Sequence, residues 1–78
     1  MAKAYLKIDI ETGKEKDVKN ALKKISGIQS ADFVTGTQDL LASVEGKNYE
    51  EIVTKTLSEI RKVKGIKKTV TDFVFEWA

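Results

Sequence analysis

The segment from Thr35 to Asp39 carries the residue types that most readily bind a small polar ligand. It supplies hydroxyl, amide and carboxylate groups beside a glycine, whose flexible backbone lets a ligand approach closely. A carboxylate together with exposed backbone amides suits the ammonium and carboxylate ends of an amino acid. The same residue types are typical of an ordinary turn, so composition by itself favours a turn and leaves a binding site as the alternative.

Groups that carry enzyme chemistry are sparse in this sequence. It contains no histidine and no cysteine, which removes common acid–base and nucleophilic catalysts together with imidazole and thiolate metal ligands. No serine lies in a nucleophile-elbow motif, and the glycines are scattered singly rather than gathered in a phosphate-binding loop. Glu50 and Glu51 fall in the expected first turn of a helix, where they complement the helix dipole. We therefore expect no catalytic residue, metal or cofactor, and predict a protein that acts by binding.

The distribution of charge argues against direct nucleic-acid binding. Fourteen basic residues against 12 acidic ones give a net charge of +2. The basic residues near the first expected helix are Lys14, Lys16, Lys19, Lys23 and Lys24. Glu15 and Asp17 interrupt them, so a solvated charged face is the favoured interpretation. No segment approaches the roughly 20 apolar residues that span a bilayer, and no signal peptide is visible, so we expect no membrane partner and a cytoplasmic location.

Residues 4–10 begin the series of elements that must position this segment. Apolar and polar side chains alternate there, as in a strand with one face on a core. Thr12 and Glu15 then have the spacing of a capping box, which predicts a helix with Thr12 as its cap. The apolar residues that follow at helical spacing are Val18, Ala21, Leu22 and Ile25. Gly27 is placed to end this helix.

The second half of the chain predicts a hairpin, another helix and a last strand. Residues 28–35 are rich in β-branched and aromatic side chains, and residues 40–45 alternate again. The short connection between them predicts that these two strands pair as a hairpin. Asn48 occupies the cap position of a second helix, and Gly65 is placed to end it. The last strand is expected over residues 66–77.

Two segments of the sequence resemble each other at a distance of 38 residues. Leu-Lys-Lys-Ile-Ser-Gly-Ile at 22–28 is echoed by Ile-Arg-Lys-Val-Lys-Gly-Ile at 60–66. Many unrelated helices end with basic residues and glycine, but we favour a structural repeat of two βαβ halves. The 78 residues then form a single domain over 1–78, an α+β ferredoxin-like βαββαβ sandwich. Two helices cover one face of a four-stranded antiparallel sheet, and the other face is open.

The last expected strand carries apolar side chains on both of its faces. Val70 and Val74 alternate with a second set, namely Phe73, Phe75 and Trp77. Because the helices cover only one face, we expect this aromatic set on the open face, with Tyr5 and Leu41 beside it. A chain this short buries only about 60% of its unfolded surface, so we expect the patch to form a dimer interface. The alternative is that the strand end folds its aromatic side chains back over the helices.

The stretch FVTGTQDLLASVEG resembles the strand–TGxxD–strand signature of the effector-binding domain, or RAM domain, of Lrp/AsnC transcription regulators. As in that family, a capped helix and a terminal strand, KGIKKTVTDFVFEW, follow it. The resemblance covers essentially the full chain, and the TG..DLL element is its more specific part. It implies a dimeric α+β barrel type of fold, dimers formed through the sheets, and assembly of dimers into rings, often octamers.

The resemblance also implies a ligand site. Family members bind amino acids or related effectors between dimers, near the TGxxD loop. By that analogy the effector-binding residues are Gly36, Thr37, Gln38, Asp39 and Leu40, with Thr69 and Thr71 as further contributors. This sequence departs from many relatives at Gln38, where they have an aromatic residue. The family's regulators also carry an N-terminal helix-turn-helix domain, whereas this chain begins at the first effector-domain strand, so no DNA binding of its own is expected.

The leading hypothesis is a stand-alone effector-sensing module that binds an amino acid and responds through homo-oligomeric assembly. Its expected partners are further copies of itself, the amino-acid effector, and a full-length Lrp/AsnC regulator paired through the shared dimer surface. The alternative is a purely structural or interaction protein that assembles without a ligand. An enzyme of the dimeric α+β barrel type shares this architecture but is disfavoured, because no catalytic constellation is present.

Overall fold

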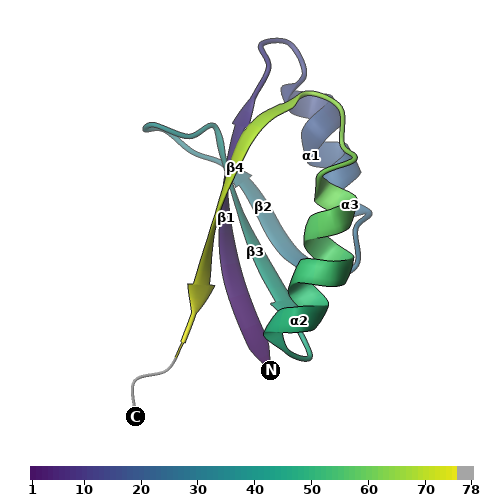
Figure 1. The fold of residues 1–78 in the computed structure, drawn as a ribbon. Coiled ribbons are helices and arrows are strands. Elements are labelled where there is room, and N and C mark those ends of the chain that lie inside the picture. Colours follow the sequence, from purple (N-terminus) through teal and green to yellow (C-terminus); the bar gives the residue numbers. More distant parts are fainter. Residues whose placement is uncertain (76–78) are drawn as a thin grey trace.

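The computed structural model describes residues 1–75 of the 78-residue chain. Its elements are, in order, β1 (Ala2–Ile10), α1 (Glu15–Lys23), β2 (Ile28–Phe33), β3 (Leu40–Gly46), α2 (Tyr49–Glu51), η1 (Ile52–Leu57), α3 (Ser58–Ile60) and β4 (Ile66–Val74). The strands form one antiparallel sheet of order β2-β3-β1-β4. Both helical segments lie against one face of this sheet (Figure 1). The predicted ferredoxin-like βαββαβ sandwich is confirmed.

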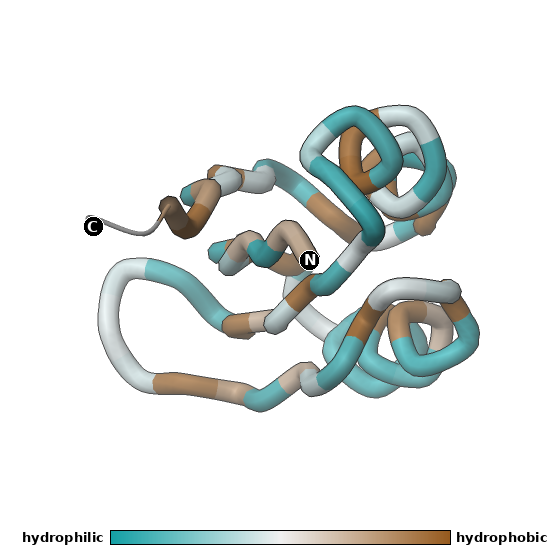
Figure 2. Tube along the Cα trace, turned by 90° about the horizontal axis from the view of Figure 1, so that it is seen from below, coloured by the Kyte–Doolittle hydropathy of each residue, from teal (hydrophilic) through white to brown (hydrophobic). Residues whose placement is uncertain are grey.

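In Figure 2 the sheet forms one layer and the two helical segments together form the other. The hydrophobic core lies between these two layers. Every second residue of β1, from Ala2 to Ile10, is buried, as the alternating sequence predicts. The fully or almost fully buried contributions from β3 and the helices are Leu40, Ala42, Val44, Val18, Leu22, Ile52 and Ile60. β1 pairs with both β3 and β4, so the central strand of the sheet also supplies the centre of the core.

The first helix begins later than the sequence predicts, and Thr12 is not its cap. α1 starts at Glu15 after Lys14, and no side chain caps its first turn. The Lys14 amide donates instead to the carbonyl oxygen of Glu11 at 3.0 Å, which places Thr12 and Gly13 at the corners of a tight turn. Glu15 reaches back only to the Gly13 amide, 2.9 Å away. The predicted capping box does not form because this turn, with Gly13 at φ +90°, comes before the helix.

The second helical segment starts at Asn48, as predicted. The Asn48 side-chain oxygen accepts a hydrogen bond of 2.8 Å from the Glu51 amide. The Glu51 carboxylate in turn accepts a hydrogen bond of 3.2 Å from the Lys47 amide. Amide groups at the start of a helix have no partner within the helix, and these two side chains satisfy two of the local donors. The asparagine cap is confirmed.

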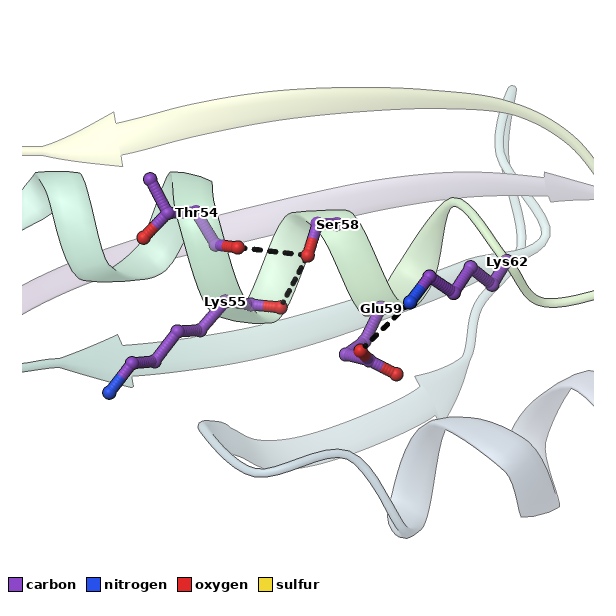
Figure 3. A network of polar contacts seen from close by, with 5 residues as sticks. All are labelled: Thr54, Lys55, Ser58, Glu59 and Lys62. Carbon is purple, nitrogen blue, oxygen red and sulfur yellow. Dashed lines mark hydrogen bonds and ion pairs between the residues drawn. The ribbon is translucent and has the colours of Figure 1, made fainter.

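The middle of this segment widens into the π-helical stretch η1, which the sequence periodicity did not predict. Two hydroxyl groups donate to backbone carbonyl groups in and just before this stretch, and Figure 3 shows the bonds of one of them, Ser58. Thr54 donates to the carbonyl oxygen of Glu50 at 2.9 Å. Ser58 donates to the carbonyl oxygens of Thr54 and Lys55 at 2.9 and 3.1 Å. In a π-helical turn the backbone hydrogen bonds join residues five positions apart instead of four. The Thr54 and Ser58 hydroxyl groups are additional donors to the carbonyl groups in this part of the helix.

The two segments that resemble each other in sequence also share their backbone bonding. The Lys24 amide donates to the Ala21 carbonyl oxygen at 3.2 Å, and the same bond recurs 38 residues later at 3.1 Å. Gly27 and Gly65 follow with φ of +98° and +100°. Both glycines have the left-handed conformation in the turn before the next strand, but α1 already ends at Lys23 and α3 at Ile60, so the prediction that these glycines end the helices is wrong. The echo in the sequence corresponds to a structural repeat of the helix-to-strand connection.

The pairing of β1 with β4 separates two residues that the sequence analysis placed together. Tyr5 pairs with Asp72, and Ala4 pairs with Phe73. Because Ala4 is fully buried under the helices, Phe73 lies on the helix-facing side of the sheet and Tyr5 on the open face, which no helix covers. The Phe73 ring meets Tyr49 of α2 edge-on, with ring centroids 5.5 Å apart. Phe73 therefore points toward the helices. This agrees with the alternative given in the sequence analysis, in which the aromatic side chains of the last strand fold over the helices.

The expected aromatic patch of Tyr5, Phe73, Phe75 and Trp77 is therefore wrong as a single surface. Tyr5 and Phe73 lie on opposite faces of the sheet, because side chains alternate along a strand and the register places them out of phase. Phe75 follows β4 and is 69% exposed. Trp77 lies outside the described residues. The apolar part of the open face comes instead from Tyr5 with Val70 and other strand residues.

Candidate functional site

The loop of residues 34–39 connects β2 to β3 and contains the predicted binding segment. It projects from the sheet on the side away from the helices (Figure 1). Gly36 has a φ of +129°, and a Cβ placed there would meet no protein atom within 4 Å. A glycine is suited to this left-handed conformation. The backbone around Gly36 is therefore accessible to a ligand or to a neighbouring subunit.

Asp39 anchors the base of this loop to β1. Its carboxylate oxygen Oδ2 accepts a hydrogen bond of 2.8 Å from the Ile10 amide. Its own amide donates to the Ile8 carbonyl oxygen at 3.1 Å. Its carbonyl oxygen accepts a hydrogen bond of 3.0 Å from the Val34 amide and so closes the loop. Two polar groups of Asp39 therefore hold the loop against β1, and a third closes the loop.

The polar groups at the tip of the loop are far less engaged. The Thr37 hydroxyl donates to the Gln38 side-chain oxygen at 2.8 Å, which orients the Gln38 amide group. Within residues 1–75, the backbone amides of Gly36, Thr37 and Gln38 donate to no other protein group. The tip thus presents unused N–H donors, a pattern that suits an acceptor such as a carboxylate.

Three of the predicted effector-binding residues lie away from the tip. Leu40 is the first residue of β3 and is fully buried in the core. Thr69 and Thr71 pair with Ile8 and Leu6, so they lie on the helix-facing side of the sheet. The loop projects from the opposite side, so one protomer does not bring these threonines to the loop tip. Their contribution to ligand binding stays a prediction.

The residues beside the loop on the open face are ones that the sequence analysis did not single out. Lys7 pairs with Leu41 on one side and with Val70 on the other. Asp9 pairs with Lys68 nearer to the end of β1. The alternation of β1 could have identified Lys7 and Asp9 as outward-facing. Their partners on β4 depend on the register, which the local sequence does not define.

The open face combines apolar side chains with charged ones. Its exposed apolar residues, each between 36% and 37% exposed, are Tyr5, Leu41 and Val70. Lys7 forms an ion pair of 3.2 Å with Asp72, and the Lys3 ammonium lies 5.2 Å from the centre of the Tyr5 ring. Both side chains of the ion pair are about half exposed, so solvent screens it and it contributes little to stability.

Three hollows of the described surface lie away from the loop. They have volumes of about 480, 530 and 400 Å³. The first lies beside Gly27 and Thr56, the second between α1 and α3, and the third beside Met1 and Tyr49. None of these three is lined by a residue of the 34–39 loop. Among residues 1–75, neither helical segment is long and apolar enough to cross a membrane.

The strand order and the two helical segments on one face of the sheet define the class of this protein, a ferredoxin-like α+β domain. Within that class, the chain belongs to the Lrp/AsnC ligand binding domain family, whose model matches residues 3–77. The family resemblance noted in the sequence is thereby confirmed over nearly the whole chain.

The chain is similar to longer regulators. An uncharacterized HTH-type transcriptional regulator of Pyrococcus furiosus is 33% identical over 57 residues, which cover 73% of this chain and 38% of the relative. The chain spans less than half of the length of the curated relatives that it matches. Each of these relatives is described as an uncharacterized HTH-type transcriptional regulator.

Solved structures share the fold. A hypothetical protein from Pyrococcus horikoshii superposes with a TM-score of 0.88 at 26% identity, covering 99% of this chain and 93% of that one. A complex of a Neisseria meningitidis transcriptional regulator with L-Met has a TM-score of 0.77 at 20% identity, covering 96% of this chain and 50% of that one. At the lower identity the likeness shows the fold alone.

Proposed function

We propose that this protein is an effector-sensing module that binds an amino acid at the 34–39 loop and responds through its assembly. The observation that carries the proposal is the contrast within the loop. Asp39 holds its base against β1, whereas Gly36 to Gln38 stand open with unused amide donors. A binding site works best when its polar groups are presented from a rigid base. This loop has that arrangement in a chain of a ligand-binding family.

The chemistry of the tip supports an amino acid as the ligand. The amides of Gly36, Thr37 and Gln38 and the Gln38 side chain suit the carboxylate of such a ligand. The Neisseria meningitidis regulator, which shares this fold, was solved in complex with L-Met. The exposed position of the loop suggests that a second subunit completes the site around the ligand. Its surface would then shield the contacts from water.

The proposed assembly uses the open face of the sheet. Tyr5, Leu41 and Val70 are exposed apolar residues there, and a domain of this size gains stability when a second copy covers them. Because the relatives are HTH-type transcriptional regulators, we propose that the same face can also pair with a full-length regulator. The module would then act on transcription through its partner, by binding and not by catalysis.

Native mass spectrometry of the chain, with and without a pool of the standard amino acids, tests the sensor function. We expect a dimer or larger assembly whose mass and population change with one member of the pool. Gln38→Ala should weaken this response, whereas Gln29→Ala, the same change at an exposed position of β2, should not. An assembly that ignores every amino acid would contradict sensing and leave a structural scaffold as the function. A monomer under all conditions would contradict the proposed assembly.

A further inference from the structure

The Asp39 carboxylate completes the hydrogen bonding of β1 at a point where the sheet itself does not. β3 begins at Leu40, which pairs with Ile8, so no β3 residue lies opposite Ile10. The side chain of Asp39 takes that place and accepts the Ile10 amide at 2.8 Å. Ile10 is only 5% exposed. A buried amide without an acceptor is costly, so this bond has a structural reason that is independent of any ligand.

The same end of β1 also holds the start of β4. The register shifts between Asp9 and Ile10, so that Ile10 pairs with Ile66. The next amide, that of Glu11, donates to the Gly65 carbonyl oxygen at 2.7 Å. Ile10, the last residue of β1, therefore binds the loop on one side, and the next residue, Glu11, binds the residue just before β4 on the other.

We propose that Asp39 is a positioning residue of the effector site, whose carboxylate sets the loop by accepting the Ile10 amide and does not bind the ammonium group of the ligand. This inference rests on the proposed function, because it concerns how the same loop binds its ligand. The ligand contacts then come from Gly36, Thr37 and Gln38, whose amides have no acceptor within residues 1–75. The negative charge of Asp39 is dispensable in this arrangement, whereas its acceptor oxygen is not.

Asp39→Asn and Asp39→Ala separate these two roles. Asparagine keeps an acceptor oxygen of the same reach and loses the charge, whereas alanine loses both. The fraction of protein carrying ligand is measured by native mass spectrometry, in titrations with the pool of standard amino acids. We expect Asp39→Asn to bind within about threefold of the original chain and Asp39→Ala to bind about tenfold more weakly. Asp32→Asn and Asp32→Ala, at an exposed carboxylate on the β2 side of the loop, are the matched controls and should bind normally.

Hydrogen exchange of the Ile10 amide gives a readout that needs no ligand. We expect exchange at Ile10 to accelerate by about tenfold or more in Asp39→Ala and to stay near its original rate in Asp39→Asn. Equal losses of binding in Asp39→Asn and Asp39→Ala would overturn the proposal, since the charge would then be required. Unchanged exchange in Asp39→Ala would overturn it as well. If the original chain binds no amino acid, the sensor function fails, while the exchange result still decides whether Asp39 positions the loop.

Discussion

The hydroxyl group of Tyr49 donates a hydrogen bond of 2.6 Å to the carbonyl oxygen of Val74. Tyr49 begins α2, and Val74 is the last residue of the edge strand β4, so the bond ties the second helical segment to the end of the sheet. The same ring meets Phe73 edge-on. These two contacts hold the end of β4 against the second helical segment.

Tyr49→Phe should lower the free energy of unfolding by about 0.5–1.5 kcal/mol, because it removes this hydrogen bond and keeps the ring against Phe73. Urea denaturation measures the change. Tyr5→Phe is the matched control, since the Tyr5 hydroxyl has no hydrogen-bond partner within residues 1–75, and its stability should be nearly unchanged. Equal effects of the two substitutions would mean that the bond to Val74 does not stabilise the fold.

Asn48→Ala should lower the free energy of unfolding by about 0.5–2 kcal/mol, because the Glu51 amide loses its acceptor at the start of the helix. Thermal unfolding followed by circular dichroism measures this loss. Asn20→Ala, on the exposed surface of α1, removes the same side chain where it caps nothing. It should be neutral or slightly stabilising, because alanine is the better helix former. A stable Asn48→Ala variant would show that the cap is not needed.

Gly27→Ala should be considerably more destabilising than Gly13→Ala. Both glycines have positive φ, so alanine at either position costs about 1–2 kcal/mol in backbone strain. At Gly13 the added Cβ meets no atom within 4 Å, whereas at Gly27 it would lie 2.5 Å from the Thr56 hydroxyl oxygen. Thr56 is buried and its hydroxyl donates to the Ser26 carbonyl oxygen, so it cannot move at little cost. Urea denaturation of the two variants gives the comparison, and equal losses would contradict it.

Val70→Lys should weaken the proposed dimer by tenfold or more, an estimate of about 1.4 kcal/mol. It places a second ammonium group beside Lys7 on the open face. Formation of the dimer would then have to remove both ammonium groups from water. Sedimentation velocity over a range of concentrations measures the dissociation constant. Val53→Lys makes the same change on the exposed surface of η1 and should leave the dimer intact. A dimer that tolerates Val70→Lys would place the interface elsewhere.

The sequence by itself determined the order of the strands and helical segments and some of their boundaries. The alternation of residues 4–10, the Asn48 cap and the glycine turns before β2 and β4 depend on residues only a few positions apart. So does the location of the loop between two β-rich segments. Such features could be predicted because hydrogen bonding and steric limits at these positions act within one or two turns of the chain. The capping box at Thr12 was wrong because a competing local turn at Gly13 forms instead.

Only the tertiary structure decided how distant residues meet. Asp39 and Ile10 are 29 positions apart in the sequence, and neither has a local pattern that indicates their hydrogen bond. The side of the sheet on which Phe73 lies depends on the register of β4 against β1, which includes a shift between Asp9 and Ile10. A difference of one residue in that register would exchange the two faces, because side chains alternate along a strand with a period of two. The pairing of strands, and not the composition of either strand, therefore determines which residues the open face presents.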